Sequence, residues 1–453
     1  MTIRHRLTRR AAAAALLLLG SLTLGTTACR DFLTGGDLST DPNRPTTVTP
    51  SQLFVGVQSA SWALLQSDPA RYAGLWTQQF GGGGIQYEPI YNYEVDESTT
   101  NGFFQAVYTG GGLPDVRELE ARTRASGDSL FLGIALVQEA LLVGTAADLF
   151  GDVPYTQALK GTPNPTLTPQ LEVYDSVQAV LAQAVTALAS KSVKNVGPGT
   201  ADLIYGGSAA RWTRLAHTLR ARYALHTAEV RGLTAYQLAR DEAAQGITSA
   251  ADNYTAVFSG QPLQQNFWYQ FDVVQRPGYL FPNAQFVALL KARSDPRLAQ
   301  YFNADQSDFA APLIQPNAPQ PMVTAGENLL IRAEAEYRLG NAAAALAALN
   351  QERAAAGLAA LAGVSGPGLL REILTEKYVA LFQNLEVWND YKRTCFPNLT
   401  PAVSGQKVTA RLFYDTAERQ TNTSIPAPED QPARNANDPA NATDPFGGAC
   451  LGQ

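Results

Sequence analysis

The stretch from Glu327 to Leu358 reads ENLLIRAEAEYRLGNAAAALAALNQERAAAGL, and it decides the fold. It holds two apolar stripes that are separated by the sequence LGN, and positions three or four apart lie on one face of a helix. Small residues in the second stripe let two helices approach closely, as they do in tetratricopeptide hairpins. The stretch therefore predicts a helical hairpin, with the stripes made by Leu330, Ala333 and Tyr337 and by Ala342, Ala345, Leu346 and Leu349.

Helical spacing of apolar residues recurs along most of the chain. It predicts a helix from about residue 129 that ends at Gly151–Pro154, another over residues 211–230, and a continuous helical stretch over residues 369–393. The fold class expected from these patterns is mainly α, with a scaffold of tetratricopeptide-like helical pairs and long irregular loops that bind a ligand. The tail from about Thr421 is rich in Asn, Pro and Ala, and we expect it to wrap the surface without elements of its own.

The N-terminus has the features of an export signal. Residues 1–28 carry arginines, then an apolar run, then small residues directly before Cys29, which predicts a cleaved signal peptide and a lipid on the Cys29 thiol. The alternative is ordinary secretion, with Cys29 left as a free or paired thiol. Residues 29–50 are rich in Gly, Pro and Thr and predict an extended tether, so residues 51–453 are expected to form a single helical domain with an irregular tail.

The net charge and the cysteine content indicate which partners and which cellular compartment to expect. The 453 residues carry a formal net charge of −6, which argues against a nucleic-acid partner. Beyond the signal peptide no apolar segment is expected to span a membrane, so any attachment should come through Cys29. Of the three cysteines, Cys395 and Cys450 then remain as a pair that can form a disulfide in an oxidising compartment, the alternative being two unpaired thiols.

Catalytic patterns are scarce in the sequence. No zinc-protease, serine-hydrolase or phosphate-loop motif occurs, and we expect no metal, no cofactor and no enzymatic activity. His226 falls on an apolar stripe and is expected to be a hydrogen-bonded core residue. The carboxylate pairs Glu118/Glu120 and Glu334/Glu336 are two positions apart and do not share a helical face, so we expect them to be solvated.

Two long segments, residues 77–115 and 252–285, concentrate aromatic rings and amides. Flat rings offer apolar faces to sugars or peptide side chains, and amides and Arg supply directed hydrogen bonds. We expect most of these rings to be structural and the two segments to converge on one ligand-binding face. The predicted ligand-binding residues are Trp76, Tyr87, Tyr91, Tyr93, Trp268, Tyr269, Gln270 and Arg276.

Seven blocks of the chain carry a resemblance to a known family, and in order they are ACRDFLTGGDLSTDPNRPT (28–46), YAGLWTQQF (72–80), ADLFGDVPYTQAL (147–159), RWTRLAHTLRARYALH (211–226), ENLLIRAEAEYRLGN (327–341), EKYVALFQNLEVWNDYKR (376–393) and IPAPEDQPARNAN (425–437). Together they resemble the SusD/RagB-like nutrient-binding outer-membrane lipoproteins, in particular their divergent second branch. The resemblance implies a helical scaffold, a ligand site on loops at one side, and attachment to the outer membrane facing the cell exterior. It also implies a SusC-like TonB-dependent transporter as partner, to which oligosaccharides or peptides are delivered.

Two other functions fit the same patterns. One is an extracellular carbohydrate-active enzyme whose paired carboxylates come from the loops. The other is a structural interaction protein built on tetratricopeptide-like pairs, with no small ligand.

Overall fold

A computed structural model describes residues 48–438 of the chain. The predicted signal peptide, the lipidation site Cys29, most of the tether and Cys450 lie outside the described residues. Cys395 is disulfide-bonded, and its pairing with Cys450 stays a prediction. Within the described residues, the chain from Pro50 onward forms one compact unit.

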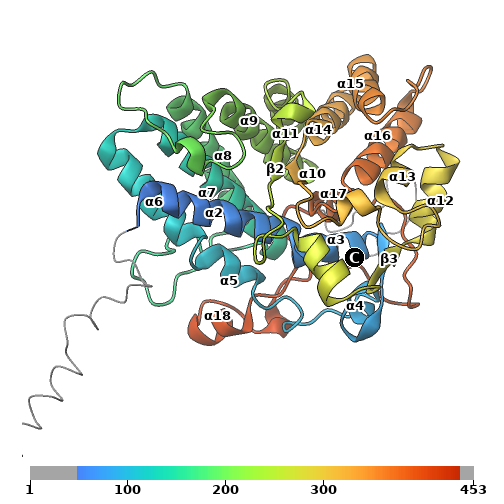
Figure 1. Cartoon of the computed structure of the whole chain (residues 1–453), viewed down its shortest axis with the longest axis horizontal. Coiled ribbons are helices and arrows are strands. Elements are labelled where there is room, and N and C mark those ends of the chain that lie inside the picture. The colour runs from blue at the N-terminus through green and yellow to red at the C-terminus, as the bar shows by residue number, and fades with distance from the viewer. Residues whose placement is uncertain (1–47, 439–453) are drawn as a thin grey trace, which may run out of the picture. The chain divides into compact units, whose positions relative to one another are not determined.

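The larger helices follow one another as an array, in which each helix contacts the next (Figure 1). The order of contact is α6 (Leu113–Ser126), α7 (Ser129–Phe150), α8 (Gln170–Leu188), α9 (Ala209–His226), α11 (Leu233–Ala243), α14 (Ala325–Arg338) and α15 (Ala342–Ala355). The predicted hairpin is confirmed as α14 and α15, and Gly340 turns the chain between them with a φ of +83°. Further helices are α2 (Pro50–Gln66), α3 (Asp68–Trp76), α10 (Ala228–Arg231), α12 (Ala284–Ala292), α13 (Arg297–Tyr301) and α18 (Thr416–Thr421).

Helix α7 is the longest helix of this array. Its first turn is capped by Asp128, which accepts a hydrogen bond from the backbone N–H of Phe131, and it ends before Gly151, as predicted. Contrary to the expectation from sequence, α7 is long and apolar enough to cross a membrane by length and composition. Its most apolar window is 89% buried inside the protein, however, so the apolar residues are used for packing on neighbouring helices.

The prediction of one continuous helical stretch over residues 369–393 is wrong. The chain forms α16 (Gly366–Ala380) and α17 (Glu386–Thr394), with a break between them. Gln383 takes a left-handed conformation with a φ of +56°, and the Asn384 side chain accepts a hydrogen bond from the backbone N–H of Glu386 at the start of α17. A local backbone turn therefore interrupts a pattern whose apolar spacing continues across it.

The two segments expected to be irregular contain short elements. Residues 77–115 form β1 (Phe80–Gly82), α4 (Gly84–Tyr91) and α5 (Phe103–Tyr108). Residues 252–285 form β2 (Tyr254–Ala256), a π-helix η3 (Tyr269–Gln275) and β3 (Leu280–Pro282). Strands β1 and β3 pair antiparallel, as do β2 and β4 (Gln320–Val323). Short 3₁₀ turns lie at η1 (Gly199–Ala201), η2 (Ala250–Asp252), η4 (Ala311–Leu313) and η5 (Pro428–Asp430).

The described part of the tail does more than wrap the surface. Asn435, Asn437 and Asp438 are buried. The amide of Asn435 donates to the backbone oxygen of Asp148, and that of Asn437 donates to the backbone oxygen of His226. Side-chain amides thus attach the tail to the ends of α7 and α9, which an Asn- and Pro-rich composition does not reveal.

Candidate functional site

The two aromatic segments meet where β1 pairs with β3. Phe80 lies opposite Pro282 and Gly82 opposite Leu280, and the backbone N–H of Gly83 donates to the oxygen of Tyr279 at 2.8 Å. Figure 1 shows this junction, with α4 in blue beside β3 in yellow. A side-chain hydrogen bond of 3.1 Å from Asn283 to the Tyr91 hydroxyl adds a second link. The expected convergence of the two segments is therefore present.

A run of four glycines, Gly81–Gly84, lets aromatic rings lie directly on the backbone of this junction. A Cβ atom on Gly81 would come within 2.2 Å of the Phe281 ring, and one on Gly84 within 2.6 Å of the Tyr279 ring. Gly84 also has a φ of +67°, a conformation that glycine adopts without strain. At Gly81 and Gly84 any side chain would displace the ring that lies on the backbone.

The outer side of these rings forms a surface that we call the aromatic face, made by Tyr91, Tyr279, Phe281 and Arg276. Phe281 is 40% exposed, Tyr91 and Tyr279 are half-buried, and Arg276 is exposed. The ring of Tyr91 lies 6.3 Å from that of Phe281, and the Arg276 guanidinium lies 5.9 Å from the centre of the Tyr279 ring. Apolar side chains of the same short elements are exposed as well: Ile85 on α4 and Val273 and Val274 on η3.

Four predicted ligand residues, Trp76, Tyr87, Tyr93 and Trp268, lie in the core and not at a surface. Trp76 packs on Trp388 with ring centres 5.0 Å apart, and Trp268 packs edge-on against Phe80 and Phe309. Stacking of a ligand on these four rings does not fit their burial, because other side chains already cover both faces and edges.

The hydroxyls of the two buried tyrosines are also occupied. The Tyr87 hydroxyl donates to Asp68 at 2.6 Å and accepts from Arg71 at 2.9 Å. The Tyr93 hydroxyl accepts from the Gln78 amide at 2.8 Å. Burial raises the pKa of both hydroxyls above the usual range. Both therefore serve as hydrogen-bonding core residues.

The other four predicted residues remain accessible. Tyr91 and Arg276 belong to the aromatic face, and Tyr269 and Gln270 are half-buried at the start of η3. Two members of the face, Tyr279 and Phe281, were not among the predicted ligand residues. The glycine run was the signal that could have identified them, because four consecutive glycines indicate that something approaches the backbone closely.

The π-helix beside the face carries a buried carboxyl group. Asp272 is 3% exposed, and its Oδ1 has no hydrogen-bond donor among the described residues. Burial and the nearby Asp308 raise the pKa of Asp272 to about 7, against the opposing effect of Arg71. π-Helical turns are rare and are often found at functional sites.

A second group of ionisable residues, Asp148, His226 and Glu386, has the proximity of a metal site. Both nitrogens of His226 are already paired, Nδ1 with Asp148 at 2.7 Å and Nε2 with Glu386 at 3.0 Å. Burial lowers the pKa of His226, but the two carboxylates more than offset this and raise it to about 9. The imidazolium is itself the cation of this group, so His226 is the hydrogen-bonded core residue expected from the sequence.

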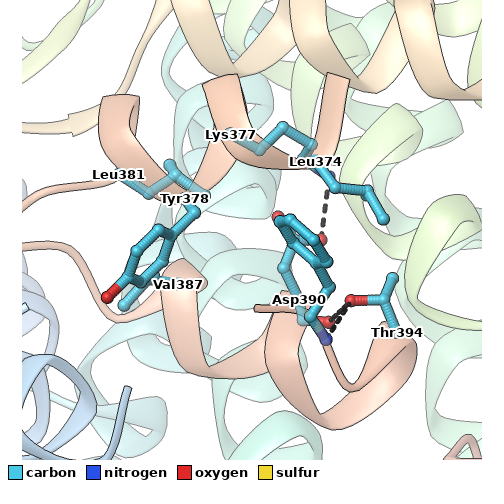
Figure 2. A pocket seen from close by; sticks show the side chains of 8 residues that line it. Leu374, Lys377, Tyr378, Leu381, Val387, Asp390 and Thr394 are labelled. Carbon is cyan, nitrogen blue, oxygen red and sulfur yellow. Dashed lines mark hydrogen bonds and ion pairs between the residues drawn. The ribbon is translucent and has the colours of Figure 1, made fainter. Parts of the chain in front are cut away.

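The expectation of solvated carboxylates is wrong for Glu120, Glu334 and Glu336, all of which are buried. Glu334 is fully buried, and it pairs with Arg393 at 2.7 Å and with Lys377 at 3.1 Å. Glu120 is 9% exposed. Figure 2 shows the adjoining cavity between α16 and α17, where Lys377 pairs with Asp390 at 2.8 Å. The cavity holds about 10 Å³, room for no more than a water molecule, so it is not a nutrient site.

Comparisons with known proteins agree with this architecture. Residues 42–311, more than half of the chain, match the SusD-like family described as "Starch-binding associating with outer membrane". No curated protein is similar enough in sequence to count as a relative.

Solved structures show the same fold at low sequence identity. A SusD/RagB family protein of Bacteroides thetaiotaomicron is 20% identical with a TM-score of 0.70, covering 83% of this chain and 95% of its own. A chitin-binding SusD homolog of Flavobacterium johnsoniae is 17% identical with a TM-score of 0.71, covering 86% and 99%. A SusD homolog of Bacteroides vulgatus is 18% identical with a TM-score of 0.70, covering 86% and 98%. By its match to the family over residues 42–311, with a helical array of the same fold, this chain belongs to the SusD-like family.

Proposed function

We propose that the chain binds a neutral oligosaccharide on the aromatic face without cutting it. The observation that carries the proposal is the β1–β3 junction, where Tyr279 and Phe281 lie against glycine backbone and both rings stay partly exposed. Sugar rings present flat C–H faces that stack on such rings, and the side chains of Arg276 and Gln270 can donate to hydroxyls.

The family supports glycans as the ligand class. The family is described as starch-binding, and the solved homolog from Flavobacterium johnsoniae is described as chitin-binding. Peptides are the competing class, because aromatic faces also hold apolar side chains. Calorimetric titration with neutral glucan and chitin oligosaccharides, and separately with peptide pools, distinguishes the two. Binding of peptides alone contradicts the glycan assignment, and mass spectrometry of the recovered ligand reveals cleavage if the chain is an enzyme.

The same proposal includes the place of the protein in the cell. The lipid on Cys29 would attach it to the outer membrane, with the helical body facing the exterior, and a SusC-like TonB-dependent transporter would receive the ligand. Replacement of the anchoring thiol, Cys29→Ala, should release the protein from membrane fractions in cells that lack the transporter. Retention of the variant at the wild-type level would contradict the anchor. Co-purification with a TonB-dependent barrel tests the partner.

A further inference from the structure

A groove of about 480 Å³ lies between α2 and the loop that follows β2. Val55, Ser59 and Trp62 of α2 form one wall, since positions three and four apart share a helical face. Phe258, Leu263 and Phe267 lie on the loop side. The volume is in the range of small-ligand sites, which are mostly apolar with a few polar groups.

Three aromatic side chains line this groove in a row. Phe258 lies edge-on to Trp62 with ring centres 6.2 Å apart and edge-on to Phe267 with ring centres 5.3 Å apart. Phe258 and Phe267 are only partly buried, so part of each ring is open. None of the described side chains that line the groove is charged. An uncharged occupant with apolar faces is therefore favoured over an ionic one.

The loop also holds an apolar side chain out in solvent beside the groove. Leu263 is 96% exposed and has a φ of +67°, which is rare for a bulky residue. Hydrogen bonds within the loop maintain this shape: the N–H of Ser259 donates to the oxygen of Gln264, and the Ser259 hydroxyl donates to the Gln264 side chain at 2.6 Å. Gln264 and Gln265 place amides at the groove, where they can bond to hydroxyls.

The groove and the aromatic face belong to one continuous segment of chain. Phe267 lines the groove, Trp268 is fixed in the core, and Tyr269 begins the π-helix that leads to Arg276. Arg71 fixes this connection: it donates to the backbone oxygen of Phe267 at 3.4 Å, and its guanidinium lies 4.4 Å from the centre of the Phe271 ring. The two surfaces are therefore held in a constant relation to each other.

We infer that the groove is a second subsite, which holds further sugar residues of a neutral glycan whose other residues lie on the aromatic face. This inference rests on the proposed function and specifies, in addition, that the ligand is long enough to occupy both surfaces. A chain long enough to reach both surfaces gains affinity because its second contact is intramolecular. Short oligosaccharides occupy the aromatic face alone.

The test uses calorimetry on the exported chain with a chitin oligosaccharide series that runs from disaccharide to octasaccharide. Ser59→Arg places a bulky side chain in the groove from an exposed position, so it removes no core packing. Thr186→Arg, at an exposed position of α8, is the matched control. We expect the wild type and the control to bind long oligosaccharides about tenfold more tightly than short ones. Ser59→Arg should lose this gain and keep the affinity for short oligosaccharides.

The outcomes separate the subsite from the proposed function. If affinity rises equally with oligosaccharide length in the wild type, Ser59→Arg and Thr186→Arg, the groove is not a subsite. Glycan binding itself is unaffected by that result. If the affinity of the wild type does not rise with oligosaccharide length, the second subsite is also contradicted. If the wild type binds no oligosaccharide of this series or of the matching glucan series, the glycan assignment itself fails. Leu263→Ser, compared with the exposed Val193→Ser, gives a second measure in which only the first variant should weaken binding of long oligosaccharides.

Discussion

Two groups of aromatic residues lie in or directly next to the same two segments and end in different surroundings. Trp76 and Trp268 are covered by other rings, whereas Tyr279 and Phe281 lie on glycine backbone and are partly exposed. Composition does not separate the two groups, because both belong to segments rich in amides and glycine. The partner on the inner side separates them: a ring that meets another ring becomes part of the core, and a ring that meets backbone can stay at the surface.

The largest effect expected from this comparison concerns Trp268. The side chain is fully buried, so Trp268→Ala should lower the free energy of unfolding by about 3–5 kcal/mol, as other large-to-small core replacements do. Urea denaturation followed by circular dichroism measures it. The same replacement at the 40% exposed Phe281 should cost less than about 1 kcal/mol. Equal costs at the two positions would contradict the division into buried and surface rings.

A smaller effect is expected where the two groups adjoin, at Asp272. Burial and Asp308 raise the pKa of Asp272 to about 7, above the value near 3.9 of an unfolded chain, while Arg71 opposes the shift. A carboxyl group of this kind stabilises the fold fully below its unfolded pKa, and the stabilisation is lost as the pH rises from about 4 through 7. The wild type should therefore lose stability over this interval.

Asp272→Asn removes the ionisable group and should flatten that pH dependence. The variant should exceed the wild type by up to about 4 kcal/mol at pH 8, since a shift of about three pKa units costs about 1.4 kcal/mol per unit, and resemble it near pH 4, in denaturation measured at both values. Asp430→Asn, at an exposed carboxyl, is the control and should change neither value. A wild type that is equally stable at both pH values, with Asp272→Asn unchanged, would show that the carboxyl is accessible to water.

Much of the fold could be predicted from apolar spacing alone. The hairpin of α14 and α15 and the end of α7 at Gly151 were confirmed. The break between α16 and α17 was missed because Leu374, Leu381 and Leu385 keep near-helical spacing through it, and the left-handed turn at Gln383 leaves no mark in that pattern. Short elements such as β1 and β3 are stabilised by pairing with distant residues, which local patterns do not contain.

The candidate site could be predicted less well. The meeting of the two segments was expected, but the depth of each ring was not, since aromatic residues in loops follow no period that identifies a buried face. The same limit explains Glu334, which was expected in solvent. Its partners Arg393 and Lys377 belong to later helices, and only the packing of those helices brings them close enough to stabilise a buried carboxylate.

The next prediction tests the surface group directly. Phe281→Ala should weaken binding of the cognate oligosaccharide several-fold to tens-fold, about 1–2 kcal/mol, because a stacking ring is lost from the aromatic face. Calorimetry measures this, and Phe281→Tyr, which keeps the ring, should bind as the wild type does. Tyr91→Ala should weaken binding in the same direction. Unchanged affinity in both alanine variants, with the fold intact by circular dichroism, would place the ligand elsewhere.

The smallest expected effect comes from moving the ring without removing it. In Gly81→Ala the new Cβ atom would lie 2.2 Å from the Phe281 ring, so the ring must move off the backbone. The clashing atoms are the far end of a 40% exposed side chain, and Gly81 has no left-handed φ, so the fold should lose less than about 1 kcal/mol of stability. Binding should weaken by about threefold, less than in Phe281→Ala, because the displaced ring still contacts part of the sugar.

The double variant Gly81→Ala/Phe281→Ala should bind no more weakly than Phe281→Ala alone, since both changes act through one ring. Additive losses in the double variant would show that the glycine backbone contacts the ligand itself.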